Sequence, residues 1–287
     1  MNLRNTQWKT QSLAFNEDIA DALQQQHHAA QFIAMAGKHL IPQQPDDSNT
    51  NMEYILNEEI LLGNAMNNGM RVALQLSELK ISVLDKANDV KKVIALEGKT
   101  MQKVFDKLKQ NLSDLGINVT GFKNELHYEI PSHQLDIGAA FSIGDKQNFM
   151  ENTTYRHNSG IAINETASVY NKAETVKVWP HHFDTGSFIP VSHNDKGEVS
   201  QSIGIGWAIP DSMVDEPYYY LSIWMEKPDD SLKTLPALAA GQWMIPNWNG
   251  AVLKHSEIQK QNSAEKQFEL VKSFYNNGIE ILRTHIK

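Results

Sequence analysis

The spacing of apolar residues changes several times along this chain, and those changes limit the folds that it can adopt. Residues 17–40 carry apolar side chains at helical spacing. Residues 71–96 instead alternate apolar and polar side chains, which is typical of antiparallel strands with one buried face. From Thr100, which can cap a helix, the helical spacing returns and continues to Gly116, which can end one. We therefore expect a helix, a group of strands and a second helix, in that order.

Three segments between these elements have weaker patterns. Residues 42–49 are rich in turn formers and predict a loop. Residues 52–66 are apolar without clear alternation, and we interpret them as a helix. Beyond the second helix the alternation is loose, and we expect a strand at 126–130 that ends at Pro131.

The second half of the chain begins with an ambiguous segment. Residues 147–175 combine a helical apolar face with the breaker sequence Asn158-Ser159-Gly160, so the pattern leaves both helix and strand open. Five later stretches have the composition of strands: 175–179, 201–209, 218–225, 242–246 and 251–254. A helix is predicted from Ser263 to about Asn276, with Gly278 interrupting it before a last apolar segment.

Helices and strands are mixed rather than strictly alternating, which favours the α+β class. We expect antiparallel sheets together with an N-terminal helical segment, a mid-chain helix and a C-terminal helix. The 287 residues suffice for one large domain or two ordinary ones. We predict an N-terminal α+β part over residues 1–130 and an aromatic-rich α+β part over residues 131–287, with one continuous domain as the alternative.

Composition narrows the classes of function. The chain has no cysteine, which excludes disulfides, thiol nucleophiles and metal sites with cysteine ligands. Its formal net charge is −8 and no basic stripe is present, so we expect no nucleic-acid partner. The first eight residues contain no apolar signal core, and no apolar stretch is long enough to span a bilayer. We therefore expect no membrane association and a cytoplasmic location.

The most unusual string in the sequence is Trp179-Pro180-His181-His182-Phe183-Asp184. If this string is extended, His182 and Asp184 lie on one face, because side chains alternate along a strand. A carboxylate beside an imidazole can orient a general base, or the two can bind a metal ion with a distant third ligand such as His193 or His255. We name His182 and Asp184 as candidate catalytic residues, and His182, Asp184 and His193 as candidate metal ligands.

The His-x-Asp motif is weak evidence by itself. With 11 histidines and 34 acidic residues, composition alone predicts roughly one such pair. The same spacing recurs at His127/Glu129 and His255/Glu257. A structural hydrogen bond between imidazole and carboxylate is therefore the main alternative to a catalytic or metal site.

Two adjacent histidines, His27 and His28, fall in the middle of the first predicted helix. Neighbouring residues on a helix point about 100° apart, so the two cannot face the same way. We expect a partly exposed pair, with a ligand-binding role as the alternative.

Tryptophan is concentrated in one part of the chain, since five of the six lie between Trp179 and Trp248. Aromatic side chains with a polar tip line small-molecule pockets and interfaces, and they also fill cores. The candidate ligand-binding residues are Trp179, Trp207, Tyr220, Trp224 and Trp243. The alternatives are core packing and a surface that contacts a protein partner or a second copy of the chain.

Five short stretches, spread over most of the chain, match a known pattern: Gln31 to Lys38, Leu112 to Ile117, Trp179 to Asp184, Tyr218 to Trp224 and Trp243 to Pro246. In this order they resemble a bacterial family that is catalogued only as a domain of unknown function. The spacing between the histidines of the first helix and Gly37-Lys38 is longer than in the family. The doublet His181-His182 is not a fixed feature of the family, which weakens the metal-site interpretation. The resemblance implies a helix over residues 147–175 and brings no assigned activity.

The sequence therefore predicts a soluble protein that binds a small molecule, contacts another protein or forms a homo-oligomer. The alternative is a metal-dependent enzyme that uses His182 and Asp184. The sequence does not indicate which cofactor, if any, the chain uses.

Overall fold

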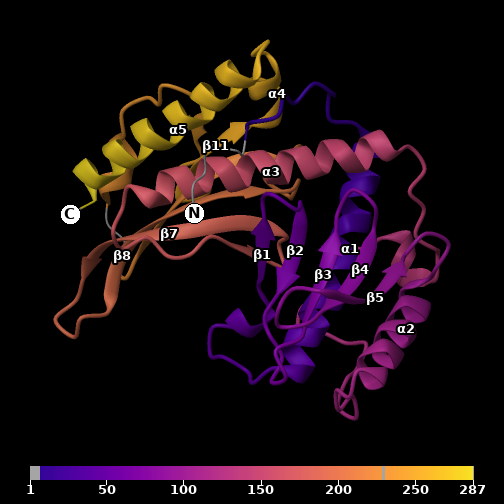
Figure 1. Cartoon of the computed structure of the whole chain (residues 1–287). Helices are drawn as coiled ribbons and strands as arrows, with labels where there is room; N and C mark the ends of the chain where they lie inside the picture. Colours follow the sequence, from indigo (N-terminus) through magenta and orange to yellow (C-terminus); the bar gives the residue numbers. More distant parts are fainter. Residues whose placement is uncertain (1–6, 228–229, 287) are drawn as a thin grey trace. The chain divides into compact units, whose positions relative to one another are not determined.

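The structure, a computed structural model, describes residues 7–227 and 230–286 (Figure 1). Residues 1–6, which contribute to the expectation on a signal segment, lie outside the described residues. The chain divides into two compact units. The N-terminal unit comprises Asn16–Thr153 and Lys177–Phe183, whereas the C-terminal unit comprises the chain up to Phe15, Thr154–Val176 and the chain from Asp184 onward. The two units therefore interleave along the sequence, and no single cut of the chain separates them.

The N-terminal unit is built around helix α1. Its elements are α1 (Glu17–Leu40), η2 (Ser48–Thr50), β1 (Met52–Ile55), β2 (Ile60–Gly63), β3 (Arg71–Gln75), β4 (Lys80–Leu84), β5 (Val90–Ala95), α2 (Met101–Asp114), η3 (Gln134–Ile137) and β6 (Lys177–Trp179). The strands follow the order β6-β1-β2-β3-β4-β5, and each is antiparallel to its neighbour. Helix α1 packs on β2 and β3, and α2 packs on β5.

Two of the three helices predicted for this unit, those at 17–40 and from Thr100, are confirmed, and their starts have the expected caps. The side chain of Asn16 accepts a hydrogen bond from the Ile19 N–H at the start of α1, and Thr100 caps α2 in the same way through Lys103. Gly116 adopts a positive φ of 80° after α2. Gly37 lies within α1. Glycine is needed there because the main chain of η2 passes where a larger side chain would stand.

Two predictions for this unit are wrong. Residues 52–66 form the hairpin of β1 and β2 instead of a helix, and the turn between them contains Glu59 with a positive φ of 55°. A short apolar run fits a buried strand as well as a helix, and all four residues of β2 are buried. The expected strand at 126–130 is absent, since that stretch belongs to an irregular segment at 116–133.

The C-terminal unit combines a sheet with two long helices. The elements from α3 onward are α3 (Lys146–Ser168), β7 (Asp184–His193), β8 (Val199–Ala208), β9 (Tyr218–Met225), η4 (Asp230–Thr234), β10 (Gln242–Trp243), β11 (Gly250–Lys254), α4 (His255–Gln259) and α5 (Ala264–His285). The first residues of α3, up to Thr153, belong to the N-terminal unit. The strands follow the order β10-β11-β9-β8-β7 with antiparallel neighbours, and α5 packs on β8, β9 and β11 (Figure 1).

The α+β class and the antiparallel strands are confirmed. The helix over 147–175 is present as α3 and continues through Asn158-Ser159-Gly160 without a break. Helix α5 also continues through Gly278, which was expected to interrupt it. Glycine at this position lets the helix approach the sheet, because a larger side chain would collide with Leu221 of β9. Strand β7 was not predicted, since Gly186 and Pro190 obscure its alternation. None of the described helices combines the length and apolar character that a membrane crossing requires.

His255 makes the stability of the C-terminal unit dependent on pH. Burial lowers the pKa of its imidazole from 6.5 to about 4, although a hydrogen bond to the Leu13 main chain opposes this shift. Because the unfolded chain binds the proton more readily, the free energy of unfolding should fall as the pH decreases from about 6.5 towards 4. Between pH 7.5 and 5, protonation of this residue alone should lower the free energy of unfolding by about 2 kcal/mol.

Urea denaturation of the wild type and of a His255→Phe variant at both pH values measures this contribution. We expect the variant to lose less stability than the wild type between pH 7.5 and 5. Equal losses in the two proteins would show that His255 is not the residue responsible.

Candidate functional site

The histidine-rich string lies at the junction of β6 and β7. Residues 180–183 form a turn, so the condition under which His182 and Asp184 would share one face of a strand is not met. Phe183 adopts a positive φ of 54° and is buried. Its ring stacks on the imidazole of His27, with centroids 4.9 Å apart and planes 6° apart, whereas His182 is exposed. The buried anchor of this turn is therefore the phenylalanine.

Asp184 begins β7 and is held by Tyr220 of β9. The Tyr220 hydroxyl donates a hydrogen bond to Asp184 Oδ2 over 2.7 Å. Burial, and then the nearby Asp184 carboxylate, raises the pKa of Tyr220, so the phenol stays neutral and acts as the donor. The ring reaches Asp184 by crossing Gly206 and Gly186, where any larger side chain would stand in its place. Two of the residues named from the sequence are thus in direct contact.

His193 lies at the opposite end of β7 from Asp184. Nine residues of extended chain span roughly 30 Å, which is too far for the two side chains to share a metal ion. Within residues 7–227 and 230–286, no three His, Asp or Glu side chains gather in a way that could hold a metal ion. The metal-site interpretation thus gains no third ligand.

The aromatic residues named from the sequence occupy different environments. Trp207 is buried, and the guanidinium of Arg156 lies 4.9 Å from the centre of its ring. Trp243 is partly buried and donates from its indole N–H to the Pro236 carbonyl over 2.8 Å. Trp179 is also partly buried, in β6, whereas Trp224 is 51% exposed. Trp207 therefore serves the core of the C-terminal unit, while Trp224 belongs to its surface.

The N-terminal unit contains a cleft of about 480 Å³ between α1, the start of α2 and the segment 116–136. Its apolar wall is formed by Met35, Met101, Leu126, Ile130 and Leu135. Its polar lining consists of His28, Gln31, Asn124, Glu125, Tyr128, Glu129, Ser132 and Asp136. Small-molecule sites combine an apolar wall with convergent polar groups; this lining has both, with more polar residues than apolar ones, and its volume falls within the usual range.

His28 forms the buried end of this lining. One ring nitrogen, Nδ1, lies 2.9 Å from the Gln24 carbonyl oxygen, and the other, Nε2, lies 3.2 Å from Asp136 Oδ1. Both ring nitrogens thus lie within hydrogen-bond distance of an oxygen atom of the protein. The expected partial exposure of His27 and His28 is wrong, because both are buried.

Tyr128 and Gln31 form a second polar group in the cleft. The Tyr128 hydroxyl donates to Gln31 Oε1 over 2.9 Å. The Gln31 amide in turn donates to the carbonyl oxygens of His27 and Pro180, at 2.9 Å and 3.0 Å. Burial, and then Asp47, raises the pKa of Tyr128, so its hydroxyl remains a neutral donor. The two side chains are fixed before any ligand arrives.

Sequence reasoning missed this cleft because it treated residues 126–130 as a strand. A signal was nevertheless present, since no regular element lies between the end of α2 and η3. Irregular segments of this length are uncommon in compact domains and are often functional.

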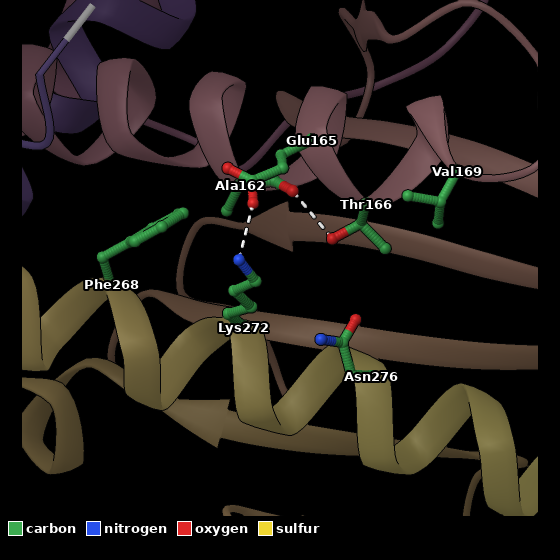
Figure 2. A pocket seen from close by; sticks show the side chains of 7 residues that line it. All are labelled: Ala162, Glu165, Thr166, Val169, Phe268, Lys272 and Asn276. Atoms are coloured by element: carbon green, nitrogen blue, oxygen red, sulfur yellow. Dashed lines mark hydrogen bonds and ion pairs between the residues drawn. The ribbon is translucent and has the colours of Figure 1, made fainter.

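A smaller hollow lies in the C-terminal unit, between α3 and α5 (Figure 2). Its volume is about 160 Å³, and an ion pair of 2.8 Å between Lys272 and Glu165 crosses it. Figure 2 shows Thr166 on α3 and Asn276 on α5 beside this pair. The volume is below the usual range for organic ligands, so the larger cleft is the better candidate site.

Comparison of the chain with protein-family models, with curated proteins and with solved structures gave no match. The family resemblance named from the sequence therefore stays a prediction.

The contact of Tyr220 with glycine can be tested by adding a methyl group. Gly206→Ala places a Cβ against the Tyr220 ring and should destabilise the protein by about 1–3 kcal/mol, because the ring must move and its bond to Asp184 is strained. Gly121→Ala is the control, since a Cβ there meets nothing within 4 Å. Urea denaturation measures both.

The effect depends on Tyr220. In a Tyr220→Ala background, Gly206→Ala should therefore cause little further loss of stability. A Gly206→Ala variant as stable as the control would contradict the packing of this face.

Proposed function

We propose that this protein binds a small organic molecule in the cleft of the N-terminal unit. The observation that carries the proposal is the convergence of His28, Gln31 and Tyr128 on a cleft with an apolar wall. Their hydrogen bonds hold them in place, so binding costs little ordering of side chains.

The lining favours recognition over a reaction of its own. The apolar wall can bury the body of a ligand, whereas Asp136 and the Asn124 amide lie at exposed positions where they can accept and donate hydrogen bonds. His28 is committed to Gln24 and Asp136, which leaves neither ring nitrogen in position to attack or deprotonate a substrate.

A fragment screen by ligand-observed NMR tests the proposal, with a variant that fills the cleft. Ser132 lines the cleft and is exposed, so Ser132→Trp should reduce the free volume while the chain still folds. We expect fragments with an apolar body to bind the wild type with millimolar affinity or better, and to lose at least tenfold in the variant.

Circular dichroism checks that the variant is folded, and Ser256→Trp, at an exposed position in the C-terminal unit, is the matched control. Fragments that bind all three proteins equally, or no binding fragments at all, would refute the proposal.

A second proposal, self-association, draws on a different observation in the C-terminal unit. Phe188 is 41% exposed and Trp224 is 51% exposed. The strand register places both on the same face of the sheet, separated by Gly204 and Ser202. No charged side chain lies between them in this register. We propose that this aromatic face, defined by these four residues, packs against its copy in a second chain, because exposed large apolar side chains commonly mark interfaces.

Multi-angle light scattering distinguishes a dimer from a monomer of 32.4 kDa. We expect a dimer for the wild type and a shift towards monomer for Trp224→Ser, since that change removes the most exposed large side chain of the face. Val169→Ser, which alters another exposed apolar residue outside the face, should leave the mass unchanged. A wild type that stays monomeric at high micromolar concentration would exclude self-association and would not affect the proposed small-molecule site.

A further inference from the structure

We infer that the ligand of the N-terminal cleft is an organic cation, an amine that is protonated at neutral pH and joined to an apolar body. This inference rests on the proposed small-molecule site and specifies its ligand class. It comes from the charges of the lining, which contains the carboxylates of Glu125, Glu129 and Asp136 but neither lysine nor arginine.

The three carboxylates differ in the partners that the protein provides for them. Asp136 pairs with His28, and it also accepts a hydrogen bond of 2.8 Å from the His133 main-chain N–H. Glu125 lies 3.4 Å from the ammonium of Lys123. Glu129 has no hydrogen-bond or ionic partner among the described residues. Among the described residues that line the cleft, Glu129 is therefore the carboxylate without a protein partner.

The rest of the cleft is suited to a cation that carries an apolar group. The aromatic ring of Tyr128 lines the cleft and is held by its hydroxyl, with the rings of His127 and His181 at 5.1 Å and 5.7 Å from it, and an aromatic ring of this kind can attract an ammonium group. Met35 and Met101 contribute polarisable sulfur and adaptable apolar surface. An anionic ligand would meet Glu129 without finding a lysine or arginine in the lining to pair with.

The test uses three probes with the same apolar body and different charges: 4-phenylbutylamine, 4-phenylbutanol and 4-phenylbutyrate. At pH 7 and low ionic strength we expect the amine to bind about fivefold to tenfold more tightly than the alcohol, and the carboxylate to bind most weakly. The advantage of the amine should shrink as salt is added, because Glu129 is exposed.

Glu129→Gln removes the charge and keeps the shape of the side chain. We expect this variant to bind the amine several-fold more weakly while its affinity for the alcohol stays unchanged. Glu280→Gln, which makes the same change in net charge at an exposed position on α5, is the matched control and should bind all three probes like the wild type.

The outcomes separate this inference from the proposed function. If the alcohol or carboxylate binds as tightly as the amine, or if Glu129→Gln weakens the alcohol and the amine equally, the cation inference is overturned and the cleft stands. The same holds if none of the three probes binds although other fragments bind in a Ser132→Trp-sensitive way. If no fragment binds in that way, the site itself is refuted.

Discussion

The fold of the N-terminal unit depends on hydrogen bonds between buried polar side chains of α1 and main-chain groups of other segments. Every residue of α1 from Gln25 to Gly37 is buried, so its glutamines and histidines have lost their contact with water. An unpaired polar group in such a place costs about 1–3 kcal/mol. The Gln26 amide avoids this cost by donating to the carbonyls of Leu76 and Phe149, both at 3.1 Å. Gln25 exchanges two hydrogen bonds with the main chain of Ser142. The helix thus fixes turns and chain connections as well as packing on strands.

The same requirement produces the cleft. On α1, His28 contacts Asp136 of η3, and Gln31 contacts Tyr128 of the irregular segment. Near the end of α1, His39 contacts the Glu125 carbonyl oxygen at 2.9 Å. The segment is therefore attached to the helix by polar contacts at separate points. The hollow lies beside these contacts, with apolar side chains along its wall.

Local signals in the sequence predicted the local structure well. The helices at 17–40 and 100–115, the strands at 71–96 and the strand at 218–225 depend on spacing and on caps such as Thr100, which operate within a few residues. The failures depend on distant partners. Residues 52–66 form a hairpin within the sheet order of the N-terminal unit, and β7 has Gly186 because Tyr220 must cross it. Neither pairing can be read from spacing along the chain.

The choice of a candidate site from the sequence has a related limit, because residue type alone does not reveal whether a polar group is already satisfied. Asp184 stood out in the sequence beside histidines, but its carboxylate accepts a hydrogen bond from the partly buried Tyr220, and the sheet needs two glycines to allow it. Glu129 was named from the sequence only as a recurrence of the His-x-acid spacing, although it lines a hollow and has no partner among the described residues. A carboxylate with a fixed protein partner is poorly suited to ligand binding, because replacing that partner by a ligand would leave the partner unpaired. A carboxylate without such a partner can bind a ligand at no such cost, and this difference directs the functional hypothesis from Asp184 to the cleft at Glu129.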